Sequence, residues 1–223
     1  MPSITAVPSW LNEQGWQLNP TDATNGPFQA GHKTDLDMFG FALTNKEKFW
    51  DDMNTFFEGD RGSPHWAEWF PVQDKLLDNS ILRPGAPVIV DVGGGRGHDI
   101  AGFRKHFPDL PGRLILQDQQ PVLDSIIALD SRARIYFLKF IMHVKDCLRV
   151  LENVKIAMEE GYSYLVIEEF ILPDEGCSLL PAEWDLMMMI YLCGMERTRS
   201  HWEALFERAD LEPAREWSGH HCR

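Results

Sequence analysis

From residue 87 onward the sequence alternates between short apolar runs and amphipathic stretches, and this alternation constrains the fold more than any other feature. The first run, "PVIVDV", is continuously apolar up to its acid, as in a strand buried on both faces of a parallel sheet. We predict further strands at 113–118, 133–142, 162–172 and 213–217, and helices at 98–107, 121–129, 147–160, 182–193 and 199–210. Strands that alternate with helices predict an α/β fold with a doubly wound, mostly parallel sheet.

The residues before this pattern look different. Residues 1–45 are rich in Pro, Asn, Thr and Gly, which predicts an irregular lead-in with one short helix. "NKEKFWDDMNTFFEGD" then has aromatic residues and Met53 at spacings of three and four, typical of an amphipathic helix. "PHWAEWFPVQDKLL" continues with Trp66, Trp69 and Phe70 on one side, which favours a place in the core or a pocket wall. We therefore expect a lead-in over 1–80 that caps the substrate side, and a ligand-binding domain over 81–223.

A glycine-rich loop follows the first strand of this domain, in "VDVGGGRGHD". A Walker phosphate loop is excluded because no Lys-Ser/Thr pair follows the glycines. The glycines at 93, 95 and 97 also miss the dinucleotide spacing, and Asp91 would repel a pyrophosphate. A carboxylate there suits a cation such as S-adenosylmethionine, whose α-ammonium and sulfonium are positive. Asp118 ends the second strand, where an acid can accept both ribose hydroxyls.

Composition excludes several other classes of function. The formal charge of -13, with no clustered basic face, disfavours nucleic acid as a partner. No apolar run reaches the roughly 20 residues of a membrane helix, and the start lacks the pattern of a signal peptide, so we expect a cytoplasmic protein. The four cysteines have neither metal nor redox spacing, and we expect reduced thiols and no metal.

Several blocks of the sequence together resemble a known family. They are "FPVQDKLL", "VDVGGGRGHDIAGFRKHFPDLPGRLILQD", "YFLKFIMH", "IEEFILPD" and "DLMMMIYLCGMERT", in family order between residues 19 and 217. In these blocks the chain resembles the fungal S-adenosylmethionine-dependent O-methyltransferases, relatives of plant caffeic acid O-methyltransferase. The resemblance implies a Rossmann-like methyltransferase sheet, S-adenosyl-L-methionine as cofactor, and methyl transfer to an oxygen.

The resemblance also implies roles for single residues. His143 in "KFIMH" matches the family's general base, and Glu169 and Glu196 match the two carboxylates that orient the imidazole. A phenol has a pKa of about 10, so its oxygen needs such a base near neutral pH. Glu168 should point to the other face of its strand, so only one of the two neighbouring acids is expected to serve. Lys139 matches a family lysine near the cofactor, beside the loop positions Asp91, Gly93, Gly95, Gly97 and Asp118.

The chain departs from the family at both edges of the expected sheet. We expect it to lack the N-terminal winged-helix dimerisation domain, an internal strand that carries the acid at the adenine, and the family's last strand. After the histidine it reads "HVKDC", without the family's Asp-Trp-Pro. We therefore expect the methionine and ribose side of the cofactor site to be kept, and the adenine side to be weakened. Uncovered apolar faces at "FWDDMNTFF" and "PHWAEWF" would favour self-association or association with a full-length relative.

Three functional interpretations remain open. The first is an O-methyltransferase acting on a phenolic or enolic hydroxyl of a small aromatic or polyketide-like secondary metabolite. The second is a methyltransferase-like cyclase or isomerase, and the third is a catalytically silent homologue that serves as a partner subunit. The catalytic trio favours the first. A flat apolar substrate pocket is expected at Phe28, Met53, Met188 and Met189.

Overall fold

The computed structural model of the 223-residue chain describes residues 2–16, 20, 22–45, 49, 52–53, 55–56, 64–77, 82–83, 85–95, 97–118, 133–143 and 146–213. The chain forms two compact units that interleave along the sequence. The first comprises residues 1–55, 142–147 and 170–205, and the second comprises residues 56–141, 148–169 and 206–223. The expected boundary near residue 80 stays a prediction.

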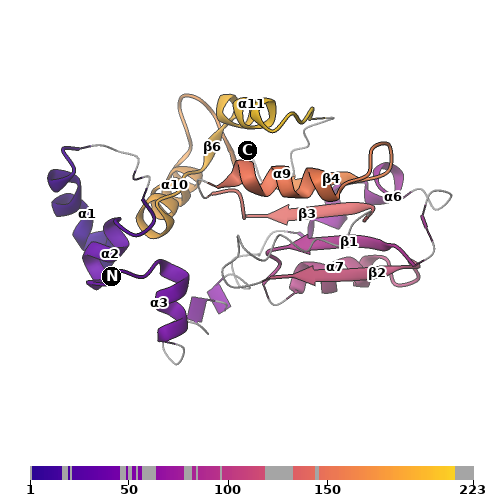
Figure 1. The fold of residues 1–223 in the computed structure, drawn as a ribbon, viewed down its shortest axis with the longest axis horizontal. Coiled ribbons are helices and arrows are strands. Elements are labelled where there is room, and N and C mark those ends of the chain that lie inside the picture. The colour runs from indigo at the N-terminus through magenta and orange to yellow at the C-terminus, as the bar shows by residue number, and fades with distance from the viewer. Residues whose placement is uncertain are drawn as a thin grey trace. The chain divides into compact units, whose positions relative to one another are not determined.

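The second unit contains a parallel sheet of four strands. They are β1 (Pro87–Val92), β2 (Arg113–Gln117), β3 (Ile135–Lys139) and β4 (Tyr164–Glu168), in the order β2-β1-β3-β4. Figure 1 shows the strands side by side, with their carboxyl ends at the same edge of the sheet. Every residue of β1 is buried, as its continuous apolar run predicts for a central strand. The α/β fold class with a doubly wound parallel sheet is confirmed.

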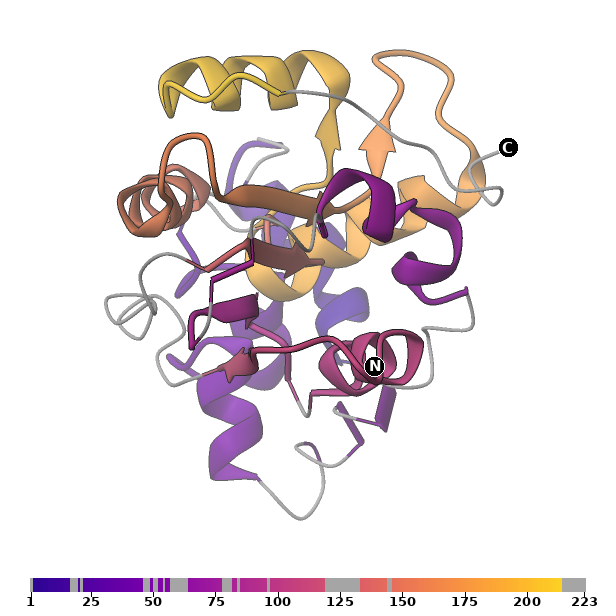
Figure 2. The same cartoon turned by 90° about the vertical axis from the view of Figure 1, so that its right-hand side faces the viewer.

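Helices cover both faces of this sheet. Figure 2 shows α7 (His98–His106) on one face and α9 (Cys147–Ala157) on the other. Helix α7 connects β1 to β2, and α9 connects β3 to β4. These two connections run in opposite directions along the strand order. Right-handed crossovers in opposite directions place their helices on opposite faces, so this arrangement follows from the strand order.

One hydrophobic core cluster of the second unit lies on the face covered by α7, together with α5 (Trp66–Trp69) and α6 (Val72–Lys75). The indole of Trp66 is 2% exposed and stacks on Phe103 and Phe137, with ring centroids 5.6 and 4.8 Å apart. The sheet itself therefore covers Trp66, whereas Trp69 and Phe70 of the same segment are half-buried. The uncovered apolar face expected at "PHWAEWF" is thus contradicted only at Trp66, and self-association stays a prediction.

The first unit is mainly helical, and the irregular lead-in expected for its residues 1–45 is wrong. Its elements include α1 (Pro2–Glu13), α2 (Pro27–His32), α3 (Met38–Thr44) and α10 (Leu179–Leu192), with two short parallel strands, β5 (Ile171–Leu172) and β6 (Arg197–Thr198). Three helices thus replace the irregular lead-in expected over 1–45. Helices α1 and α2 approach so closely that a Cβ at Gly31 would lie 2.6 Å from the Pro2 backbone. Tertiary packing therefore makes helices from a segment rich in Pro and Thr.

The remaining expectations differ mostly at element ends. Strand β3 stops at Lys139 because Phe140 has a φ of 51°, and β5 is separate from β4. Helix α11 (Arg199–Arg208) is confirmed, and its last three residues belong to the second unit. The helix expected at 121–129, nearly all of the strand expected at 213–217 and much of "NKEKFWDDMNTFFEGD" lie outside the described residues. No described helix is both long and apolar enough to cross a membrane.

Candidate active site

The glycine loop leaves the carboxyl end of β1 and leads into α7. A Cβ at Gly94 would lie 2.3 Å from the Asp91 carboxylate, and one at Gly93 would lie 2.5 Å from Ile141 Cδ1. Gly93 also has a φ of 73°. The carboxylate of Asp91, 1% exposed, therefore lies directly against the loop. Both glycines are explained by close packing, of Gly94 against Asp91 and of Gly93 against Ile141.

Gly95 is different, because its surroundings are open. It has a φ of 58°, and no described atom lies within 4 Å of the position that a Cβ would take. Its N–H donates a hydrogen bond of 2.8 Å to Oδ2 of the exposed Asp118, just after β2. Gly97, with a φ of 80°, is the N-cap residue that precedes α7. Gly95 thus faces open space, and its N–H is hydrogen-bonded to Asp118 just after β2.

Lys139 at the end of β3 forms a buried ionic network. Its ammonium lies 3.3 Å from Oδ1 of Asp99 in α7 and 3.1 Å from Oε2 of Glu168 at the end of β4. Asp99 Oδ2 also lies 3.1 Å from Nε2 of His98. The side chains of Lys139 and Asp99 are only 7% and 4% exposed, so each charge depends on its partner. This network joins the start of α7 to the carboxyl ends of two strands.

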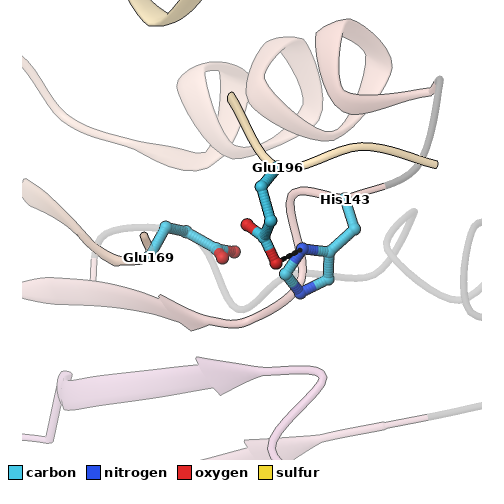
Figure 3. A group of neighbouring side chains, drawn as sticks. All are labelled: His143, Glu169 and Glu196. Carbon is cyan, nitrogen blue, oxygen red and sulfur yellow. Dashed lines mark ion pairs between the residues drawn. The ribbon is translucent and has the colours of Figure 1, made fainter. Parts of the chain in front are cut away.

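His143 and Glu196 form an ion pair within the first unit. Nδ1 of His143 lies 3.1 Å from Oε1 of Glu196, and Figure 3 draws this contact as a dashed line. The two side chains are 8% and 2% exposed. A buried carboxylate at Nδ1 stabilises the imidazolium and favours the tautomer with its proton on Nδ1, which leaves Nε2 as the basic nitrogen. A pair of this kind can accept a proton from a ligand.

Glu169, also drawn in Figure 3, belongs to the second unit. One of its carboxylate oxygens accepts a hydrogen bond of 2.7 Å from the N–H of Ile141, two residues before His143 in the chain. Its neighbour Glu168 instead pairs with Lys139. The two adjacent acids, Glu168 at the end of β4 and Glu169 just after it, thus have different partners.

The residues expected at a substrate pocket lie in the first unit. Phe28 is 4% exposed, and its ring lies 5.5 Å from that of Phe41 and 6.2 Å from that of Tyr191. Met188 is buried in α10, and its neighbour Met189 and the more distant Met53 are half-buried. Helix α2, which carries Phe28, packs against α10. Their role toward a substrate stays a prediction.

Comparison with known proteins shows which family the chain resembles. Residues 128–212 match the O-methyltransferase domain family. The O-methyltransferase penC of Penicillium thymicola is 34% identical over 238 residues, which cover 97% of this chain and 58% of penC. The O-methyltransferase mpaG of Penicillium brevicompactum is 32% identical over 234 residues, which cover 95% of this chain and 58% of mpaG. Over nearly its whole length the chain is similar to O-methyltransferases. It spans 58% of the length of these two relatives.

Solved structures agree with this family. A protein described as "A Pericyclic Reaction enzyme" is 29% identical, with a TM-score of 0.80 over 93% of this chain and 58% of its own. LepI in complex with SAM is 28% identical, with a TM-score of 0.79 over 93% of this chain and 57% of its own. OxaC in complex with sinefungin and meleagrin is 21% identical, with a TM-score of 0.82 over 99% of this chain and 60% of its own, which supports the fold alone.

The structure adds two residues that the sequence did not single out. Gly94 leaves no room for a Cβ beside the Asp91 carboxylate, and Asp99 pairs with Lys139. The signal for Gly94 was its place in the glycine run, and Asp99 follows that run closely. For Asp99 no local pattern points to Lys139, which lies 40 residues further along the chain.

Proposed function

We propose that the chain binds S-adenosylmethionine and catalyses methyl transfer to a phenolic or enolic hydroxyl of a small secondary metabolite. The observation that carries the proposal is the buried ion pair between His143, on the loop that follows β3, and Glu196, just before β6. The Ile141–Glu169 hydrogen bond, two residues earlier, supports it by tying the same loop to the end of β4. Similarity to O-methyltransferases supplies the type of reaction that we propose.

The glycine loop fits the proposed cofactor. Its open side at Gly95 allows the backbone to approach a ligand, and the acids beside it suit a ligand with positive charges and ribose hydroxyls. When bound, S-adenosylmethionine supplies an electrophilic methyl group for an ionised substrate oxygen. The residues that we propose to hold it are Asp91, Gly93, Gly95, Gly97, Asp118 and Lys139.

His143 has the central chemical role in this proposal. Its Nε2 takes the proton of the substrate hydroxyl, while Glu196 at Nδ1 stabilises the resulting imidazolium. Glu169 supports this step by holding the loop at the Ile141 N–H. The apolar side chains of Phe28, Met188 and Met189 suit a flat aromatic or polyketide-like substrate.

Calorimetric titration with S-adenosylmethionine tests the proposal most directly. We expect saturable binding, followed by methyl transfer to phenolic substrates in an assay with a labelled methyl group. Complete absence of binding would eliminate methyl transfer. His143 and Glu196 each offer an atom that could ligate a metal ion, so the assay is repeated with a chelator. We expect unchanged activity, because a base and not a Lewis acid activates the oxygen.

A second candidate function is supported by the similarity to the pericyclic enzyme. In a cyclase or isomerase, the same pocket would shape a substrate and the bound cofactor would act only as a cation. The labelled methyl group separates the two functions, because rearrangement of a substrate without transfer of the label favours the second. Binding without either reaction would favour a silent partner subunit.

Asp118 provides a test of the ribose site. We expect Asp118→Ala to weaken S-adenosylmethionine binding by about 1.5 to 3 kcal/mol, roughly ten- to a hundredfold, because a charge-assisted acceptor is lost. Asp118→Asn keeps an acceptor for the Gly95 N–H and should lose less. The matched control is Asp109→Ala, which removes an exposed acid near the amino end of β2. Unchanged affinity in Asp118→Ala would place the ribose elsewhere.

A further inference from the structure

Three consecutive residues, of which the last is the first residue of β6, bind two consecutive residues of the loop after β3 within the first unit. The N–H of Met195 donates a hydrogen bond of 2.9 Å to the carbonyl oxygen of His143, and Glu196 pairs with the imidazole of the same residue. The guanidinium of Arg197 donates to the carbonyl oxygen of Met142. The segment 195–197 thus holds both the backbone and the side chain of the segment 142–143.

Arg197 is an unusual residue for a purely structural hydrogen bond. It is 8% exposed, and a buried guanidinium is costly unless its donors are satisfied. Its charged group lies over the ring of the buried Trp202, 5.7 Å from the centroid, which adds a cation–π contact. The start of α11, which carries Trp202, therefore fixes the guanidinium that reaches the Met142 carbonyl.

Neighbouring groups hold the same loop in place. A Cβ at Gly194 would lie 2.4 Å from the His143 carbonyl oxygen, so the two backbones meet with no room for a side chain. Oδ1 of Asp185 in α10 accepts a hydrogen bond of 2.8 Å from the Glu196 N–H. Burial raises the pKa of the Asp185 carboxyl, and the hydrogen bond from Glu196 N–H opposes part of this rise. Helix α10 thereby anchors the residue whose carboxylate faces His143.

We propose that Arg197 is a positioning residue for His143. This inference rests on the proposed function of His143 as the base. By holding the Met142 carbonyl, Arg197 fixes the backbone just before His143. The His143 side chain is thereby oriented with Nδ1 toward Glu196. Without Arg197, the imidazole can turn and present either nitrogen to Glu196, so that Nε2 is the basic nitrogen for only part of the time. The planar guanidinium fork suits this task better than a lysine ammonium.

The test compares Arg197→Met, Arg197→Lys and, as a control that removes an exposed arginine of α11, Arg208→Met. Nitrogen-15 NMR of labelled histidine reports which ring nitrogen of His143 carries the proton, with His143→Asn for assignment. We expect one tautomer in the parent and in the control, and mixed or averaged ring signals in Arg197→Met. We also expect kcat for methyl transfer to fall about 10- to 100-fold with little change in KM for S-adenosylmethionine, as for a slightly misplaced base. Arg197→Lys should restore part of the single-tautomer signal and part of kcat.

The outcomes separate this inference from the function on which it rests. If the parent binds no S-adenosylmethionine, the proposed function fails, while the ring signals still test the position of the imidazole. If the parent methylates and Arg197→Met shows the parent's single tautomer, the inference is overturned. Should Arg197→Met fail to fold, Arg197→Lys is measured instead, and a tautomer ratio and a kcat equal to those of the parent overturn the inference.

Discussion

His143→Ala is expected to reduce methyl transfer by about 10²- to 10⁴-fold, the usual contribution of a positioned general base. The affinity for S-adenosylmethionine should stay nearly unchanged, because the proposed cofactor residues lie along the glycine loop and at the ends of β2 and β3. The physical reason is the high pKa of a phenol, which leaves its oxygen protonated near neutral pH unless a base accepts the proton. Rates are measured with saturating cofactor, and affinities by calorimetry on the same samples.

His106→Ala is a matched control for this substitution. It removes an exposed imidazole from the last turn of α7, and we expect little change in rate or affinity. Activity that survives in His143→Ala at neutral pH would mean that proximity alone drives the reaction or that another group is the base. A loss of cofactor affinity equal to the loss of rate would instead indicate a structural role for His143.

The two proposed orienting acids should behave differently from the base. Glu196→Gln keeps a hydrogen-bond acceptor near Nδ1 but removes the charge that stabilises the imidazolium, so its effect should be milder than that of His143→Ala. Glu169→Gln keeps an oxygen for the Ile141 N–H and should also be mild. Because the three side chains are proposed to act as a unit, adding either change to His143→Ala should cost little more.

The parallel sheet could be predicted because its strands carry strong local signals. The buried run "PVIVDV" and the glycines after it define β1 and the loop without any knowledge of distant residues. The helices of the first unit carry weaker signals. Helix α2 starts at a proline, and its cap is the Gln29 side chain, which accepts a hydrogen bond of 2.9 Å from the Gly26 N–H. Since Pro and Gly also mark turns, this segment was expected to be irregular.

The supporting residues of the candidate site could not be predicted for a different reason. Arg197 reaches a carbonyl 55 residues away, and Asp99 reaches Lys139 over 40 residues. Sequence spacing reports neighbours on one helix or strand, whereas these partners meet only after the chain has folded. The resemblance to a family supplied His143, Glu169 and Glu196 as candidates. It did not supply the contacts that hold them.

Gly95→Val is expected to abolish S-adenosylmethionine binding. At a φ of 58° a β-branched residue is strained, and its side chain would fill the open space where the loop can approach a ligand. Gly95→Asn separates these two effects, because asparagine tolerates the left-handed conformation but still fills the space. We therefore expect Gly95→Asn to keep the thermal stability of the parent and to lose most of the affinity.

Gly161→Val is the matched control for backbone strain. Gly161 has a φ of 71°, and no described atom lies within 4 Å of its Cβ position. It precedes the amino end of β4, whereas Gly95 follows the carboxyl end of β1. Strain alone should lower the melting temperature of Gly161→Val and of Gly95→Val alike, whereas only the Gly95 variants should lose the cofactor. Calorimetric titration and thermal unfolding on the same samples measure both quantities. Binding by Gly95→Asn as tight as in the parent would show that this glycine serves only the turn, and that the cofactor approaches the sheet somewhere other than the loop after β1.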